Sequence, residues 1–335
     1  MAKPRVRLKE IAESTGYSVN TVSLALRGSP RLPEETRALI LKEAERQNYL
    51  PNHIARSLKN QATHTIGLVL TDIMNPTITL AARTIEQQLA NAGYGVMFAA
   101  SDNVLANEVK ALSRFQSYQV DGIIIYPTNR NETDHIAAIH DSGMPILALA
   151  DVSKGKLNVV AVDDRMGAYK AVEHLISKGH KQIAILDGAY SLGHSDKVEG
   201  AQKALSDAGL PVENLRIINP LGSSAAHGFR AAQKALEQSP RPTALFATTD
   251  SLGIGVLNWC INNGVNVPGD LAVVGYDNTE ASEYCSIPLT TINYAADKVS
   301  SYAVARLIDM IEQRDVIEDK IITLIEPDLV VRSST

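Results

Sequence analysis

A small group of side chains near the N-terminus has the chemistry to read DNA bases. The group shares the outer face of an expected helix over residues 19–26, with a basic residue at its end: Val19, Asn20, Ser23, Leu24 and Arg27. An asparagine amide can pair with the edge of an adenine in the major groove. Reading bases in this way requires a second helix that holds the first one across the groove.

The spacing of Ala12, Gly16 and Val22 predicts that second helix. These residues supply a small side chain at a helix crossing, a flexible turn and a β-branched side chain behind it. Apolar residues at helical spacing start at Leu8, and the pattern breaks at Gly16, where a positive φ angle is easily adopted. The spacing is typical of a helix-turn-helix unit.

Capping residues predict three short helices in this region. Ser18 is a good N-cap for the helix over residues 19–26. Pro33, followed by two glutamates, opens a third helix with a rigid first turn and negative charge at its positive end. We expect the buried side of that third helix to carry Leu39, Ile40 and Ala44.

Charge is distributed unevenly along the chain. Residues 1–60 carry 11 Lys and Arg against 6 Asp and Glu, a net charge of +5, whereas the remaining residues carry 21 against 31, a net charge of −10. A local basic excess favours a polyanionic partner, because Lys and Arg displace counterions from a phosphate backbone. The charge therefore supports DNA as the partner of the N-terminal region.

Composition excludes several classes of protein. The 335 residues are 45% hydrophobic and 21% charged, which is ordinary for a globular chain long enough for two or three folding units. Neither a signal peptide nor an apolar stretch of membrane-spanning length is evident, so we expect a cytoplasmic protein without membrane contact. Cys260 and Cys285 are too few for a disulfide scaffold or a metal clip.

The segment from Leu8 to Lys59 resembles the DNA-binding headpiece and hinge helix of the LacI/GalR (lactose-repressor) family of bacterial transcription regulators, in order and spacing throughout. In that family the hinge helix lies in the minor groove and wedges a leucine into the central base step, the position held here by Leu58, between Arg56 and Lys59. The resemblance implies DNA contacts by Lys9, Ser18, Val19, Asn20, Thr21, Ser23, Leu24, Arg27, Asn52, His53, Ala55, Arg56, Leu58 and Lys59.

One position departs from many relatives. Leu24 stands where they carry an arginine, and a leucine cannot form the two hydrogen bonds by which arginine reads a guanine. It could contact a thymine methyl group instead. Val19 and Asn20 are then the main candidates for base readout, and the operator sequence stays open.

Short β-branched runs alternate with amphipathic stretches from Thr65 onward. Strands are expected at 66–70, 96–100, 122–126, 146–149, 183–186, 244–247 and 271–274, and helices at 81–92, 168–178, 228–238 and 252–263. This rhythm predicts parallel sheets with helices on both faces, in two similar α/β subdomains.

The family resemblance continues to the end of the chain, through Gly179-His180, Val274-Gly275-Tyr276-Asp277, Leu289-Thr290-Thr291-Ile292 and Leu329-Val330-Val331-Arg332. It implies an all-α headpiece (1–50), a hinge helix and linker (51–64) and an α/β core (65–335) similar to periplasmic binding proteins. The core would divide into one subdomain of about 65–162 and 293–324 and another of about 163–292 and 325–335, with a small effector between them.

Ligands of open α/β sheets bind beyond the carboxyl ends of the strands. This rule selects the polar residues that follow each expected strand: Asp72, Asn75, Tyr126, Tyr190, Thr249, Asp250 and Asp277. The resemblance adds Lys197, which stands where the family usually has an effector-gripping arginine, and Thr77 and Ile78, which replace an aromatic pair. Carboxylates, amides and hydroxyls together suit a sugar or sugar derivative, although a lysine lacks the planar two-pronged geometry of arginine. Trp259 is expected in the core rather than the site.

Three classes of function compete. The favoured one is a homodimeric transcription regulator, in most cases a repressor, that binds a pseudo-palindromic operator under control of a small effector. A stand-alone solute-binding protein and a sugar-modifying enzyme are the alternatives. We expect no catalytic residue, metal or cofactor: His174, His180 and His194 lack matching ligand spacing, and Gly253-x-Gly255 lacks the third glycine of a dinucleotide fingerprint.

Overall fold

The computed structural model describes residues 6–49, 62–152, 157–189, 195–312 and 320–335. The chain forms two compact units, residues 1–63 and 64–335. Within its described residues, the smaller unit consists of the helices α1 (Leu8–Thr15), α2 (Val19–Leu26) and α3 (Glu34–Arg46).

The three helices of the smaller unit share one small core. It is built from Ile11, Ala12, Val22, Ala25, Ile40 and Ala44. Gly16 ends α1 with a φ of 72°, and the Ser18 side chain caps α2, both as the sequence predicts. The expectation for Leu39 is wrong, because 49% of its surface is exposed. Ile40 and Ala44 lie one turn apart and define the inner face, so Leu39 is rotated about 100° away from it.

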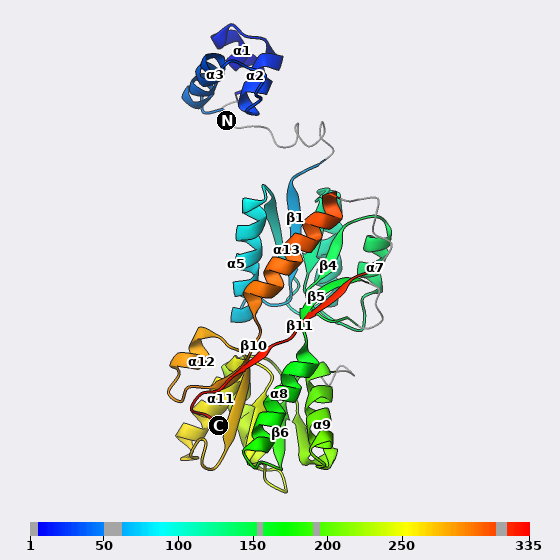
Figure 1. The fold of residues 1–335 in the computed structure, drawn as a ribbon, viewed down its shortest axis with the longest axis vertical. Coiled ribbons are helices and arrows are strands. Elements are labelled where there is room, and N and C mark those ends of the chain that lie inside the picture. Colours follow the sequence, from blue (N-terminus) through cyan, green and yellow to red (C-terminus); the bar gives the residue numbers. More distant parts are fainter. Residues whose placement is uncertain (1–5, 50–61, 153–156, 190–194, 313–319) are drawn as a thin grey trace. The chain divides into compact units, whose positions relative to one another are not determined.

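Among the described residues, the larger unit contains two six-stranded sheets. The first is parallel throughout, with the order β11-β5-β4-β3-β1-β2. Its strands are β1 (Thr65–Leu70), β2 (Gly95–Ala100), β3 (Gly122–Ile125), β4 (Ile146–Ala148), β5 (Asn158–Val162) and β11 (Ile322–Ile325). Helices α5 (Pro76–Asn91) and α13 (Ala296–Glu312) pack on one face, side by side in Figure 1, and α6 (Leu105–Ser117) and α7 (Asp134–Asp141) pack on the other.

The second sheet has the order β12-β10-β9-β8-β6-β7, and only β12 runs antiparallel to its neighbour among the described strands. Its strands are β6 (Ile183–Leu186), β7 (Leu215–Ile218), β8 (Ala244–Ala247), β9 (Ala272–Asp277), β10 (Thr290–Asn293) and β12 (Asp328–Val330). Helices α8 (Asp164–Ser177) and α9 (Asp196–Asp207) cover one face; α10 (Ala225–Leu236) and α11 (Asp250–Asn262) cover the other. The short helix α12 (Glu280–Tyr284) and a 3₁₀ turn (Val212–Asn214) complete this half.

The chain passes three times between the halves built on these sheets. The passages lie between β5 and α8, between β10 and α13, and between β11 and β12. The fold class expected from the sequence, a helical headpiece followed by a two-sheet α/β core, is therefore confirmed. Several bounds differ: α8 begins at Asp164 rather than Ala168, and β9 extends to Asp277. Among the helices of the described residues, none combines the length and apolar character needed to cross a bilayer.

Candidate functional site

The outer face of α2 presents the side chains expected to read DNA. The Ser18 hydroxyl accepts a hydrogen bond from the Thr21 amide at 3.1 Å, which fixes the first turn of the helix. Val19 and Asn20 are exposed, and the Arg27 guanidinium donates to the Ser23 carbonyl at 3.0 Å. The exposed Val19 and Asn20 side chains therefore leave this face of α2 accessible to a partner.

The structure describes only some of the other residues that are expected to contact DNA. Lys9 is exposed on α1, 3.8 Å from Glu13, and Leu24 is partly buried. The hinge residues Asn52, His53, Ala55, Arg56, Leu58 and Lys59 lie outside the described residues. Their roles stay predictions from the sequence.

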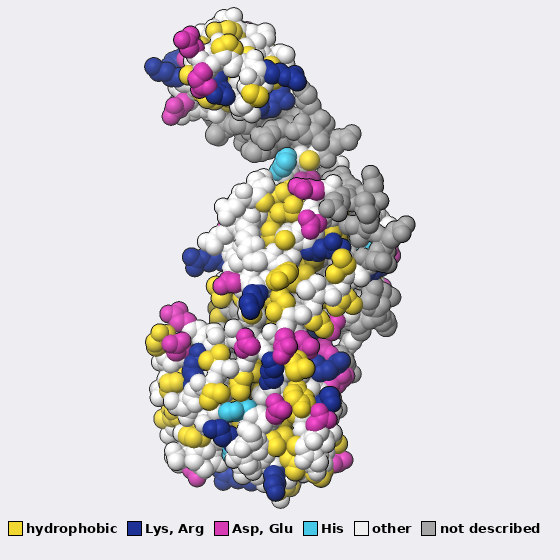
Figure 2. All heavy atoms as spheres, in the orientation of Figure 1, with side chains coloured by type: hydrophobic (Ala, Val, Ile, Leu, Met, Phe, Trp, Pro, Cys, Tyr) yellow, Lys and Arg dark blue, Asp and Glu magenta, His cyan; other side chains and the backbone are white. Residues whose placement is uncertain are grey.

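A cavity of about 320 Å³ lies between the two halves of the larger unit, at the carboxyl ends of strands from both sheets. Acidic and basic side chains gather around the middle of this unit in Figure 2. Seven of the expected effector contacts line the cavity: Asn75, Thr77, Ile78, Tyr126, Lys197, Thr249 and Asp277. The position agrees with the general rule for open α/β sheets.

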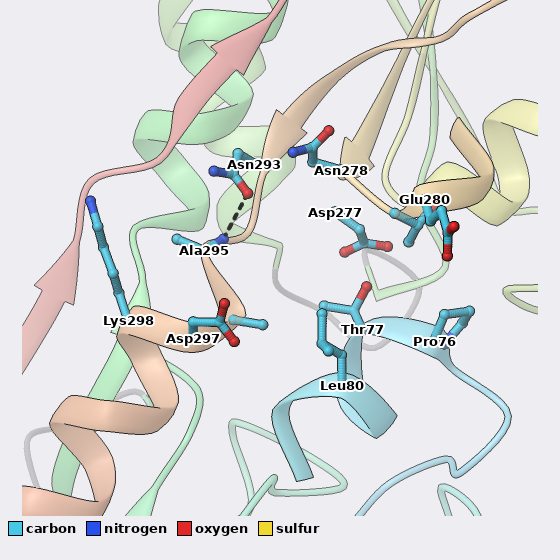
Figure 3. Close-up of a pocket in the computed structure, with 12 residues that line it drawn as sticks. Pro76, Thr77, Leu80, Asp277, Asn278, Glu280, Asn293, Ala295, Asp297 and Lys298 are labelled. Carbon is cyan, nitrogen blue, oxygen red and sulfur yellow. Dashed lines mark hydrogen bonds between the residues drawn. The ribbon is translucent and has the colours of Figure 1, made fainter. Parts of the chain in front are cut away.

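A second cavity of about 480 Å³ adjoins the first and shares Thr77 and Asp277 with it. It lies between the first turn of α5, the residues that follow β9, and the start of α13 (Figure 3). In Figure 3 the Thr77 hydroxyl points toward the Asp277 carboxylate, whereas the Lys298 side chain extends away from both. The two cavities together form one cleft.

The Thr77 hydroxyl is buried beside the cleft. The residue is only 6% exposed, and its oxygen has no hydrogen-bond partner among the described residues. Its backbone is held firmly, since the Asn75 side chain caps α5 by accepting from the Thr77 and Ile78 amides at 3.0 and 3.5 Å. A buried hydroxyl without a partner is costly, so this atom is a candidate contact for a bound ligand.

The Asp164 carboxylate is the centre of the polar network in the cleft. It accepts a hydrogen bond from the Arg130 guanidinium at 2.9 Å and from the Tyr276 hydroxyl at 2.8 Å, and Lys197 Nζ lies 3.7 Å away. Burial acts to raise the pKa of Asp164, but Lys197 and Arg130 outweigh burial and hold the pKa below its usual value. Asp164 is therefore ionised at neutral pH.

Lys197 is held by other groups as well. Its ammonium donates to the Thr248 carbonyl at 3.0 Å and lies 3.5 Å from the centroid of the Tyr276 ring. Together with the nearby Asp164, these contacts satisfy the cation from within the chain. Lys197 thus lines the cavity, but its positive charge is already stabilised by groups of the chain.

The pKa of Asp277 is shifted in the opposite direction from that of Asp164. Desolvation in the cleft raises the pKa of Asp277 well above its usual value, and Lys197 offsets this only in part. A carboxyl group that retains its proton can donate as well as accept a hydrogen bond. Burial also raises the pKa of Tyr126 to about 12, and its hydroxyl lies 3.4 Å from that of Tyr294. These groups offer neutral donors and acceptors.

The structure does not bring every expected residue into the cleft. Asp72 faces its own loop, where it accepts from the Met74 amide at 2.8 Å. Asp250 is fully buried, and its carboxylate accepts from the Thr279 amide at 2.7 Å and the Thr291 hydroxyl at 2.5 Å. Neither carboxylate lines either of the two cavities, and both order turns beside the cleft. Tyr190 lies outside the described residues. Trp259 lies on α11 and packs, partly buried, against the core.

Sequence reasoning missed several lining residues, namely Arg130, Asp164, Asp187, Asp196 and Tyr294. Arg130 comes five residues after β3 ends, beyond the positions directly after the strand. Asp164 and Asp196 are the first residues of α8 and α9, so the signal for them was the start of each helix rather than the end of a strand.

A helix-turn-helix unit joined to a two-sheet core with a polar cleft defines a ligand-binding transcription regulator. The model of bacterial regulatory proteins of the lacI family matches residues 7–52, and that of the periplasmic binding protein-like domain matches residues 172–335. Catabolite control protein A of Priestia megaterium is 32% identical over 322 residues, covering 95% of this chain and 96% of that protein. The regulator DegA of Bacillus subtilis (strain 168) is 31% identical, with 86% of each chain covered.

Solved structures agree. The lac repressor dimer bound to operator and the anti-inducer ONPF matches with a TM-score of 0.88 at 27% identity, over 99% of both chains. A LacI family regulator from Enterococcus faecium with bound ribose matches at 26% identity and a TM-score of 0.71, over 81% of this chain and 98% of the other. The chain belongs to the lacI family of bacterial regulatory proteins. It is a DNA-binding transcription regulator with a ligand-binding core, and its relatives named above are regulators rather than enzymes.

Proposed function

We propose that the protein is a cytoplasmic, non-catalytic repressor that binds a pseudo-palindromic operator as a homodimer, and that a small uncharged polyhydroxy compound in the cleft controls its operator affinity. The observation that carries the ligand class is the compensation of both cations lining the smaller cavity. Arg130 lies 2.9 Å from Asp164 and 3.6 Å from Asp196, and Lys197 lies 3.7 Å from Asp164.

An anionic ligand would have to compete with a carboxylate that the chain itself supplies. Apart from Asp277, whose raised pKa favours its protonated form, three carboxyl groups line the smaller cavity against two cations among the described residues: Asp164, Asp187 and Asp196. Like charges brought together in a partly desolvated cleft repel strongly, so a phosphate or carboxylate on the ligand would be disfavoured. Uncharged hydroxyl groups avoid this electrostatic repulsion and can form hydrogen bonds with the polar residues that line the cavity.

Uncharged hydroxyls also supply what the cleft lacks. The buried Thr77 oxygen has no partner among the described residues, and a ligand hydroxyl would satisfy it. Residues Asn75, Ile78, Tyr126, Thr249 and Asp277 would contribute the remaining contacts, with Lys197 behind them. The related regulator with bound ribose supports a sugar-sized ligand.

For DNA, we propose that α2 enters the major groove with Val19 and Asn20 reading bases. Arg27 and Lys9 would contact the backbone, as would Ser18, Thr21 and Ser23, with Leu24 against an apolar base edge. The hinge residues Asn52, His53, Ala55, Arg56 and Lys59 would follow the minor groove beside Leu58. The operator-bound relative, a dimer, supports this arrangement.

The experiment measures thermal unfolding and operator binding with matched ligands. Each set contains a neutral sugar, its sugar acid and its phosphate, for example glucose, gluconate and glucose 6-phosphate. A ligand at 100 times its Kd adds about 2.7 kcal/mol to the stability of the unit that binds it. We expect the neutral member of a set to raise the melting temperature and to change operator affinity.

Two results would count against the proposal. Binding only by charged members would refute the ligand class while leaving the regulator intact. Binding of a neutral sugar without any change in operator affinity would refute the control of DNA binding. Deleting residues 1–60 gives the control, because it should abolish operator binding and leave the ligand-induced shift in place.

A further inference from the structure

Arg130 forms an ion pair that bridges the two halves of the larger unit. It follows β3 of the first sheet, and its guanidinium lies 2.9 Å from Asp164 and 3.6 Å from Asp196. Those carboxylates begin α8 and α9, which pack on the second sheet. The contact therefore spans the cleft.

The carboxylate side of the bridge is firmly mounted. The side chains of Asp164 and Asp196 are each only 9% exposed. The Tyr276 hydroxyl holds the second oxygen of Asp164 at 2.8 Å, and Arg165 holds the second oxygen of Asp196 at 2.9 Å. Each anion also lies at the positive end of a helix. Arg130 thus meets two anions whose positions are fixed.

The arginine side of the bridge is mounted as well. The loop before Arg130 is tied to α6 and to the residue that follows β2. The Thr128 amide donates to the buried Glu108 carboxylate at 2.5 Å, and the Thr128 hydroxyl donates to the Ser101 hydroxyl at 2.8 Å. His135 on α7 contacts the other Glu108 oxygen at 2.6 Å. Both ends of the bridge are therefore anchored to their own halves by further hydrogen bonds.

We propose that Arg130 is a positioning residue that holds the cleft closed through Asp164 and Asp196 before any ligand binds. Every partner in the bridge belongs to the chain, so closure needs no ligand. A planar guanidinium suits a bridge between two carboxylates, which a lysine ammonium would serve less well. Apparent ligand affinity then depends on the bridge, because it scales with the fraction of protein in the binding-competent state.

Arg165 provides a matched control. It contacts Asp196 at 2.9 Å and Glu199 at 2.7 Å, but these residues all lie on α8 and α9 of the same half. Arg165→Gln removes one positive charge and one contact to Asp196, as Arg130→Gln does. Only Arg130→Gln removes the link between the halves.

The experiment measures cleft opening by thiol labelling of the full-length protein without ligand. Thr77→Cys places a thiol in the cleft at a position that is 6% exposed and outside the bridge. Labelling by a soluble disulfide reagent is followed residue by residue through peptide mass spectrometry. The native Cys260, which is fully buried in the core, reports global unfolding in the same sample.

We expect Arg130→Gln to speed labelling of the introduced thiol at least tenfold and to leave Cys260 unchanged. Arg165→Gln should change neither rate by more than twofold, and Arg130→Lys should give an intermediate acceleration, which keeps the test informative if Arg130→Gln folds poorly. An unchanged rate in both Arg130 variants would overturn the proposal. So would an equal acceleration by Arg165→Gln, because the effect would then come from lost charge at Asp196.

Discussion

Replacing Thr77 by valine should make the ligand-free protein more stable and should lower its affinity for the ligand. Thr77 lies in the first turn of α5, is 6% exposed, and has a hydroxyl without a partner among the described residues. Valine has the same shape with a methyl group in place of the hydroxyl, and its helix propensity is close to that of threonine. The substitution therefore changes the polarity of one atom and little else.

The expected magnitude follows from that atom. A buried polar group without a partner costs about 1–3 kcal/mol, and Thr77→Val removes this cost. A gain of about 1 kcal/mol would raise the melting temperature by about 2–4 °C in a unit of this size. A ligand that donates to or accepts from the hydroxyl loses one hydrogen bond of about 0.5–1.5 kcal/mol, so its Kd should rise by about 2- to 13-fold.

Chemical denaturation gives the stability, and calorimetric titration with the ligand identified by the thermal screen gives the Kd. Thr79→Val, two residues along the same helix, is the control. Its hydroxyl already donates to the Ile73 and Asn75 carbonyls at 2.8 and 3.0 Å, so the substitution removes existing hydrogen bonds. Thr79→Val should leave the protein no more stable than the parent and should not change the Kd of the ligand.

The substitution is expected to raise stability and to lower ligand affinity, and each of these effects can be refuted separately. A destabilised Thr77→Val protein would mean that the hydroxyl already has a partner, such as a bound water. Unchanged ligand affinity with raised stability would remove Thr77 from the ligand contacts while leaving its burial as described.

Three further predictions concern the cleft and the hinge. Tyr276→Phe should lower the free energy of unfolding by about 1.5–3 kcal/mol, measured by urea denaturation, because it removes a hydrogen bond to the ionised, buried Asp164. Asp277→Asn should stabilise the protein more at pH 8 than at pH 4. Desolvation raises the pKa of Asp277 on folding, so this residue lowers the free energy of unfolding once the pH rises above its unfolded-state pKa. Equal effects of the substitution at both pH values would contradict this prediction. Leu58→Ala should weaken specific operator binding by at least tenfold in a salt-matched titration if this leucine wedges a base step, and unchanged affinity would exclude the wedge.

The headpiece was predictable because its signals are local. A cap at Ser18, a left-handed turn at Gly16 and an apolar pair one turn apart act within a few residues, and the structure has α2 with the bounds expected for it. The error at Leu39 has the same origin. Helical spacing near residue 40 admits two adjacent apolar positions, and only packing against α1 and α2 decides which of them is buried.

The cleft was predictable only where strands supply its residues. The rule that ligands bind beyond strand ends placed Asn75, Tyr126 and Asp277 in the lining. It could not separate Asp250 from Asp277, because both follow strands that the sequence predicts, and these strands belong to the same sheet. Tertiary contacts separate them: Thr279 and Thr291 surround Asp250 and withdraw it from the cavity.

The same limit applies to charge. Taken alone, a lysine in a binding cleft suggests an anionic ligand, and Lys197 has that appearance in the sequence. Its ammonium, however, lies within reach of Asp164, a carbonyl and an aromatic ring, all supplied by the chain. Arg130 is paired with both Asp164 and Asp196, so two buried carboxylates face the two cations that line the smaller cavity among the described residues. What a cleft can bind therefore depends on which charges its own residues leave uncompensated, and here that balance favours hydroxyl groups over anions.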